Sequence, residues 1–233
     1  MVTAVLAERD VLAEQFTAFA DRLGPFESAT AGPYPVLCGR HVALLAGGVG
    51  PAAAASATAS VLAAASATAS GLAGSGQFDL VLSAGIGGGF TGRAGVGDLV
   101  AASEIRAADL GAVGADGFLS VDDLGFGSSL VPAVDLGVPG AHVGPVLTVS
   151  TVTGTEQRAR ELMDRFDAAA EAMEGFGVAE AARAYGLPVG ELRGISNLVG
   201  RRDRSTWDIP AGLDALRRSV PRLVDLIEEG IPT

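Results

Sequence analysis

A short apolar run that breaks into polar side chains lies in the last fifth of the sequence. Leu192–Ser196 has the composition of a β-strand, and Asn197, a glycine, three arginines, an aspartate and Trp207 follow it. An open α/β sheet presents its ligand site at the carboxyl ends of its strands. The amide of Asn197 stands at such an end and can both donate and accept in one plane, as a purine edge requires. A simple turn at Asn197 explains this window equally well.

Carboxylates form a second group of candidates. Glu8 and Asp10 follow the apolar run Val2–Leu6, where they could serve chemistry at a strand end or complement the dipole of the helix that they open. Glu174 lies between Met173 and a Gly-Phe-Gly segment, and a carboxylate in such apolar surroundings needs a partner. A ribose diol would supply two donors to one carboxylate. The alternative for Glu174 is a surface residue near a helix start.

Two glycine-rich segments follow predicted strands. Ala46–Gly50 ends the predicted strand His41–Ala46 and could aim backbone N–H groups at an anion or a sugar hydroxyl, although such glycines also permit tight packing. Gly85–Gly89 ends the predicted strand Phe78–Ala84. This density of glycine indicates that another strand or a flat ligand comes close to the backbone.

Alternating strands and helices must position these groups, and residues 1–233 are predicted to form one α/β domain. The segment Ala107–Gly144 shows no clear period and is expected to be a surface excursion that helps to close over a ligand. The predicted strands are Val2–Leu6, Pro35–Cys38, His41–Ala46, Phe78–Ala84, Asp98–Ser103, Pro145–Val152 and Leu192–Ser196. Helices are predicted from Glu8 to about Leu23, over Pro51–Ala73, from Glu156 to about Phe166, after Ala170–Glu180 and before Gly186, and over Pro210–Ile231.

Composition excludes several classes of function. The net charge is −11, so a nucleic-acid partner is not expected, and all 16 basic residues are arginine, which excludes a P-loop lysine or a Schiff base. The single Cys38 is expected to be a buried structural thiol, His41 to be structural at the start of a strand, and His142 to be a solvated loop residue. No residues have metal-ligand spacing, and no signal peptide or membrane span is recognised, so a cytoplasmic protein without a metal is expected.

Four blocks, in this order and at this spacing, resemble the nucleoside phosphorylase and nucleosidase superfamily over nearly the whole chain. They are Ala46–Gly50, Ser83–Gly89 with Gly97-Asp98, Ala172–Glu174 and Arg193–Asn197. The match is weakest between about Ala107 and Gly144. Within the superfamily, the segments Glu191–Asp203 and Val152–Thr155 look most like the futalosine hydrolase family.

This resemblance implies a three-layer α/β fold with a mixed central sheet flanked by helices, in a homo-oligomer of two or more subunits. It implies hydrolysis of the N-glycosidic bond of a nucleoside, futalosine, to hypoxanthine and dehypoxanthine futalosine in menaquinone biosynthesis, without a cofactor. The catalytic residues implied are Glu8, with Asp10 as the alternative carboxylate for water, Arg193 and Asn197; the substrate-binding residues implied are Gly87, Gly88, Thr153, Met173 and Glu174.

Asn197 falls where adenosine-type members of the superfamily carry Asp. Hypoxanthine offers two acceptors on that edge, N7 and O6, and an amide NH2 can donate to either, so a 6-oxopurine substrate is favoured over adenine. Phe90 and Trp207 are the candidates for stacking on the base, and the arginines at 201, 202 and 204 are candidates for the carboxylate of the futalosine tail.

Three alternatives remain open from the sequence. A methylthioadenosine or adenosylhomocysteine type of nucleosidase would share the fold. A phosphorylase would replace water by phosphate, which Arg40 or Arg93 would have to approach. A nucleoside-binding protein would bind without turnover and would not need Glu8 or Asp10.

Overall fold

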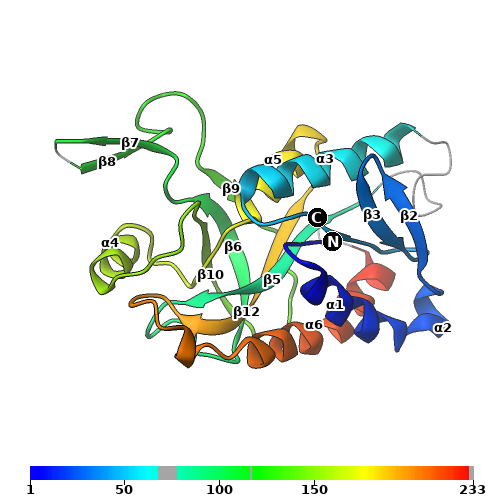
Figure 1. Cartoon of the computed structure of the whole chain (residues 1–233). Helices are drawn as coiled ribbons and strands as arrows, with labels where there is room; N and C mark the ends of the chain where they lie inside the picture. The colour runs from blue at the N-terminus through cyan, green and yellow to red at the C-terminus, as the bar shows by residue number, and fades with distance from the viewer. Residues whose placement is uncertain (68–77, 116, 231–233) are drawn as a thin grey trace.

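A mixed ten-stranded sheet with helices on both faces is the framework of the protein, as a computed structural model that describes residues 1–67, 78–115 and 117–230 shows (Figure 1). The strands are β1 Val2–Thr3, β2 Glu27–Ala31, β3 Tyr34–Cys38, β4 Ala43–Ala46, β5 Val81–Gly89, β6 Leu99–Ala107, β7 Gly111–Gly114, β8 Gly117–Ser120, β9 Leu130–Pro132, β10 His142–Thr148, β11 Ala170–Ala172 and β12 Val189–Leu198. Strands β7 and β8 form a separate hairpin that projects from the body of the molecule.

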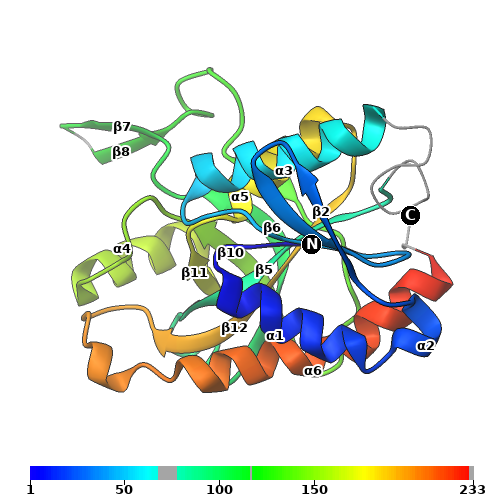
Figure 2. The same cartoon turned by 45° about the vertical axis from the view of Figure 1, so that its right-hand side comes forward.

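Six helices cover the sheet in the described part of the chain. They are α1 Leu6–Thr17, α2 Ala20–Leu23, α3 Pro51–Ala67, α4 Glu156–Phe166, α5 Gly175–Ala184 and α6 Ile209–Glu229, with a short 3-10 turn at Arg204–Thr206. Helices α3 and α5 lie together on one face, and α1 and α6 lie on the other (Figure 2). Alanine-rich α3 and α5 pack closely because their small side chains let two backbones approach. The expected three-layer α/β arrangement is confirmed.

The strand order is β11-β10-β6-β12-β5-β1-β4-β3-β2, with β9 on β6. Strand β11 also pairs antiparallel with β5, through Ala170 on Gly89 and Glu171 on Gly88. This second pairing curls β5, β12, β6, β10 and β11 into a closed unit, which the sequence did not predict. Because β12 and β11 both pair with β5 at Gly88, the predicted site residues on three strands come together at one end of the sheet.

Several predicted boundaries are wrong. The glycine run 85–89 lies inside β5 rather than after it, and the first strand ends at Thr3 because the helix already begins at Leu6. The helix predicted to Leu23 is interrupted after Thr17, and residues 170–172 form a strand. The parts of the predicted helices beyond Ala67 and at 231 lie outside the described residues.

Other expectations are confirmed. Antiparallel β3 and β4 form the predicted hairpin, and Thr155 caps α4 by accepting from the Arg158 N–H at 3.2 Å. Cys38 is buried, and burial raises the pKa of its thiol. The predictions for the histidines are only partly right: His142 is exposed as expected but begins β10 instead of lying in a loop, with its Nε2 3.1 Å from Asp98 Oδ2, and His41 is exposed before β4.

Candidate active site

A fully buried arginine is the centre of the predicted site. Arg193 lies in the middle of β12, and its Nε donates to Glu191 at 2.8 Å, its Nη2 to the Ser83 hydroxyl at 2.9 Å and its Nη1 to Glu174 at 3.2 Å. Burial by itself lowers the pKa of this guanidinium, but the surrounding carboxylates raise it by more. The net pKa is raised, so Arg193 stays charged. The arginine therefore acts as a fixed positive centre to which carboxylates from different elements are attached.

Glu8 reaches this centre from the first turn of α1. Its Oε2 accepts from the backbone N–H of Ala4 at 2.9 Å and of Val5 at 3.2 Å, and its Oε1 accepts from that of Ile86 at 2.9 Å. Gly85 makes this possible, because a Cβ there would lie 2.7 Å from both Glu8 Oε1 and Arg193 Nη1. The glycine inside β5 thus leaves room for a carboxylate and a guanidinium of the protein itself.

Glu174 lies at the N-terminal end of α5 and contacts Arg193 Nη1. Its Oε1 accepts from the Gly50 N–H at 3.2 Å, in the turn between β4 and α3, where Gly48 and Gly50 have positive φ of 93° and 94°. Helix α5 can approach this turn because Gly177 has no side chain; a Cβ there would lie 2.0 Å from the Pro51 carbonyl oxygen. The first glycine-rich segment therefore contributes a backbone donor to the predicted ribose carboxylate.

Asn197 lies at the end of β12 and is half buried. Its Oδ1 accepts from the Ser196 hydroxyl at 2.8 Å, and its Nδ2 donates to the Leu198 carbonyl at 3.1 Å. These two contacts fix the orientation of the amide. A Cβ on the neighbouring Gly88 would lie 2.9 Å from Val199 Cγ2 and 3.1 Å from Asn197 Nδ2, so this glycine leaves room for both side chains. An amide held in this way can present a donor to an acceptor on a flat ligand.

Thr153 is attached to a buried carboxylate on β11. Its backbone N–H donates to Glu171 Oε1 at 2.8 Å, and its hydroxyl donates to Glu171 Oε2. Burial raises the pKa of Glu171, although the Thr153 hydrogen bonds oppose this. Met173, the other predicted contact to the sugar, is partly exposed beside Glu174. Gly87 lies under the Arg193 stem, with the Glu171 carbonyl oxygen 2.9 Å from the place of its missing Cβ.

Some candidates do not join this cluster. Asp10 is exposed and pairs with Arg9, with Asp10 Oδ1 2.6 Å from Arg9 Nη2, so the buried carboxylate at this end of α1 is Glu8. Phe90 is fully buried in the core with Leu147 and Val149 and cannot stack on a ligand from there. Trp207 is partly exposed, and Arg202 Cζ lies over its ring, 5.8 Å from the ring centroid. Arg201, Arg202 and Arg204 are exposed.

The two arginines considered for phosphate have other partners. Arg93 Nη2 lies 3.1 Å from Asp167 Oδ2, and Arg40 is exposed where its backbone N–H donates to Leu23 O at 3.2 Å. The turn at residues 47–50 instead offers its Gly50 N–H to Glu174. These contacts give no support to a phosphate site at this turn.

Sequence reasoning missed two members of the cluster, Glu191 and Ser83. Both are fully buried, and they are paired with each other across β12 and β5. A signal for Glu191 was present: it precedes Arg193 by two residues in a strand, so the two side chains lie on one face with opposite charge. Ser83 carries no comparable signal, because a serine in an apolar strand is common.

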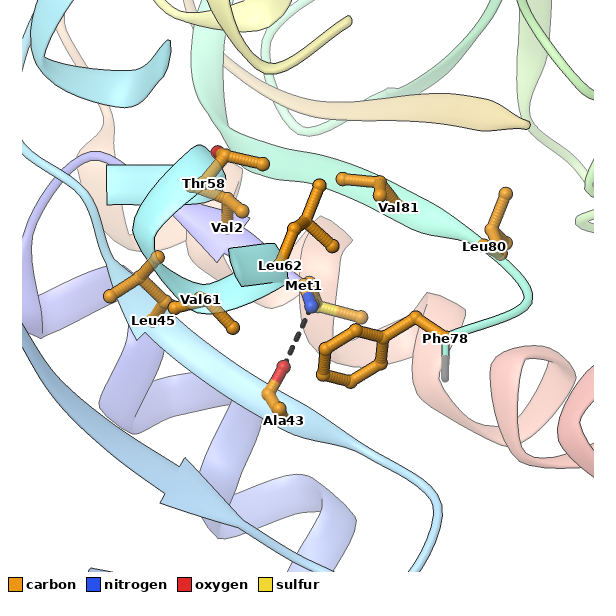
Figure 3. Close-up of a pocket in the computed structure, with 10 residues that line it drawn as sticks. All are labelled: Met1, Val2, Ala43, Leu45, Thr58, Val61, Leu62, Phe78, Leu80 and Val81. Atoms are coloured by element: carbon orange, nitrogen blue, oxygen red, sulfur yellow. Dashed lines mark hydrogen bonds between the residues drawn. The ribbon is translucent and has the colours of Figure 1, made fainter. Parts of the chain in front are cut away.

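A separate pocket lies between β1, β4, α3 and the start of β5 (Figure 3). Its walls are apolar except for Thr58 and the amino group of Met1, which donates to the Ala43 carbonyl at 2.7 Å. Burial lowers the pKa of this amino group to about 5. The pocket contains none of the predicted site residues and offers little polar chemistry.

Within residues 1–67, 78–115 and 117–230, none of the helices combines the length and the apolar character needed to cross a membrane. Over the same ranges, no three His, Cys, Asp or Glu side chains are grouped so that they could hold a metal ion.

Comparison with known proteins gives consistent matches over the length of the chain. The model of the phosphorylase superfamily matches residues 12–231. A futalosine hydrolase from Streptomyces coelicolor is 49% identical, over 100% of this chain and 97% of its own length.

Solved structures share the fold at lower identity. A futalosine hydrolase of Helicobacter pylori has a TM-score of 0.76 at 18% identity, covering 98% of this chain and 96% of its own. A 5'-methylthioadenosine/S-adenosylhomocysteine nucleosidase from Colwellia psychrerythraea, in complex with adenine, has a TM-score of 0.74 at 22% identity, with coverages of 98% and 93%.

Proposed function

The chain belongs to the futalosine hydrolase family of the phosphorylase superfamily, and we propose that it hydrolyses the N-glycosidic bond of futalosine. The products are hypoxanthine and dehypoxanthine futalosine, in menaquinone biosynthesis. The observation that carries the proposal is the Asn197 amide, held by Ser196 and Leu198 with its NH2 group over Gly88. A donor held at this point suits the N7 and O6 acceptors of hypoxanthine.

The departing base gains negative charge as the bond to the ribose breaks. Asn197 donates to the base at N7 or O6 and stabilises this charge without any need for a protonated carboxyl group. Gly87 and Gly88 lie beside this amide in β5 and line the base and the sugar.

The ribose becomes positively charged in the same step. Glu174 accepts hydrogen bonds from the ribose hydroxyls, and the negative charge that it carries with Glu8 favours an oxocarbenium-like centre between them. Glu8 then takes a proton from the attacking water as the new C–O bond forms. Arg193 keeps Glu174 in place, and backbone N–H groups of Ala4, Val5 and Ile86 hold Glu8.

Three coarser features complete the proposal. Residues 1–233 form one nucleosidase domain, which the shared sheet and the cores on its two faces support. The protein works in the cytoplasm on a small nucleoside, without a cofactor. It assembles as a homo-oligomer, which the strongly exposed apolar side chains of Val113 in β7 and of Phe126 support.

Base release from futalosine, inosine and methylthioadenosine, each with and without phosphate, tests the function. We expect hypoxanthine from futalosine at the same rate in both buffers, and no adenine from methylthioadenosine. Adenine release, or turnover only with phosphate, would contradict the proposed reaction. The assignment of the family and the fold would still stand.

A further inference from the structure

The proposed reaction gives no role to Glu191, although its carboxylate contacts Arg193. Glu191 is fully buried, its Oε1 accepts from Arg193 Nε at 2.8 Å, and its Oε2 has no hydrogen-bond partner among the residues that the structure describes. A buried carboxylate oxygen without a donor is unfavourable for folding. The position of Glu191 therefore calls for a functional explanation.

Gly175 provides the space for this carboxylate at the start of α5. A Cβ at Gly175 would lie 2.2 to 2.5 Å from three carboxyl atoms of Glu191. Glu174, the preceding residue, contacts the same guanidinium through Nη1. Glu191 on the strand and Glu174 at the helix start thus share one arginine.

The way in which Arg193 divides its N–H groups has a consequence for Glu174. An arginine with free N–H groups pairs with a carboxylate through two parallel hydrogen bonds, the strong bidentate arrangement. Here Nε is held by Glu191 and Nη2 by Ser83, so Glu174 receives a single N–H at 3.2 Å. Its carboxylate keeps acceptor positions for other donors.

We propose that Glu191 is a positioning residue: by holding Arg193 Nε, it fixes the guanidinium in the orientation in which Nη2 stays on Ser83 and only Nη1 faces Glu174, and so keeps Glu174 available to the ribose hydroxyls. This inference rests on the proposed nucleosidase function. Without Glu191, the guanidinium turns toward Glu174 and competes with the ribose for the same oxygens.

Calorimetric binding of inosine and of 2′,3′-dideoxyinosine tests this role without requiring turnover. The wild-type protein should prefer inosine, because only inosine has the hydroxyls. Glu191→Ala should lower this preference about tenfold, the effect of one hydrogen bond to a charged group. Glu191→Gln should retain most of the preference, because its amide oxygen still accepts from Nε.

A structural defect would weaken both ligands equally and leave their ratio unchanged. An unchanged ratio in Glu191→Ala, or no preference or binding in the wild type, overturns the inference. Hypoxanthine release from futalosine by the wild type is measured separately. If the wild type releases no hypoxanthine but the binding ratios are as expected, the proposed reaction is rejected and the positioning role of Glu191 stands.

A double-mutant cycle with Gly175 gives a second test. Gly175→Ala alone should reduce the preference for inosine, because the new Cβ displaces the Glu191 carboxylate. In the Glu191→Ala background the space is free, so the same change should have no further effect. Additive effects would overturn the inference. Arg183→Ala, on the exposed side of α5, is the matched control and should leave the ratio unchanged.

Discussion

Two carboxylates on different elements, Glu174 and Glu191, share one buried guanidinium, and Glu8 lies beside it with backbone partners of its own. Glu8 is held by three backbone N–H groups, whereas Glu174 has one backbone donor from Gly50 and a weaker contact to the Met173 N–H at 3.4 Å. Asn197 is separate from this charged group and is held by a hydroxyl and a carbonyl. The proposed contact to the base and the proposed contacts to the sugar and water therefore lie in two separate groups of residues.

The substitution Asn197→Asp should lower hypoxanthine release from futalosine by up to about 10⁴-fold. It replaces the amide NH2 donor by a carboxylate oxygen, which would face the N7 and O6 acceptors of the base. Its second oxygen would also face the Leu198 carbonyl that now accepts from Nδ2. Asn197→Ala, which removes the donor without adding charge, should lower kcat by about 100- to 1000-fold. The measurement is steady-state hypoxanthine release. If Asp is tolerated better than Ala, the amide is not the donor to the base.

Replacing Glu8 by Gln should reduce kcat by about 100- to 10,000-fold, the usual contribution of a general base. The matched control is Asp10→Asn two residues away, which should be nearly neutral because Asp10 is exposed and paired with Arg9. Kinetics and thermal melts of both variants separate activity from folding. Equal losses in the two variants would mean that Glu8 is not the residue that activates water.

At the scale of elements, glycines determine how closely the site-bearing segments approach. Gly85 in β5 admits Glu8 and Arg193, and Gly177 in α5 admits the first turn of α3. Gly177 faces the backbone carbonyl of Pro51, which cannot rotate away as a side chain can. The hydrogen bond from the Gly50 N–H to Glu174 depends on this close approach of α5 to α3.

Gly177→Ala should therefore destabilise the protein by about 1–3 kcal/mol through overpacking, although alanine favours a helix by about 1 kcal/mol. It should also weaken binding of the ribose, because the Gly50 N–H moves away from Glu174. Chemical denaturation and KM for futalosine measure the two effects. A stabilised variant with unchanged KM would show that the α3–α5 approach does not support the site.

At the scale of the whole molecule, a buried acid links stability to pH. Burial raises the pKa of Glu171 in the folded state, so the folded protein holds this proton to higher pH than the unfolded chain. The stabilisation that comes from this bound proton is fully present below the ordinary pKa of Glu, about 4.3. It is lost as the pH rises through the raised pKa of Glu171 in the folded state.

The variant Glu171→Gln resembles the protonated acid and can keep both contacts to Thr153. We expect its free energy of unfolding to equal that of the wild type near pH 4 and to exceed it increasingly toward neutral pH, from about the ordinary Glu pKa upward. Denaturant titrations at a series of pH values measure the difference, in which other titrating groups cancel. Parallel curves would contradict a raised pKa at Glu171.

The sequence by itself determined the fold class and the family, and it contained most of the residues that the structure brings together in the proposed site. Strand and helix periodicity arise from the local order of apolar and polar residues. Motifs such as Ala172–Glu174 and Arg193–Asn197 are contiguous in the sequence and can therefore be read from it directly. The sequence also contained the opposite charges of Glu191 and Arg193 at strand spacing, although their importance was not recognised.

Only the tertiary structure decided which of these groups meet. The choice of Glu8 over Asp10 as the buried carboxylate, the burial of Phe90, and the pairing of β11 with both β10 and β5 depend on contacts between distant segments. Local patterns cannot specify such contacts, because they are fixed by which surfaces pack after the sheet closes. The glycines of β5 illustrate this: their number was visible in the sequence, but the atoms that fill the space above them come from α1, β11 and β12.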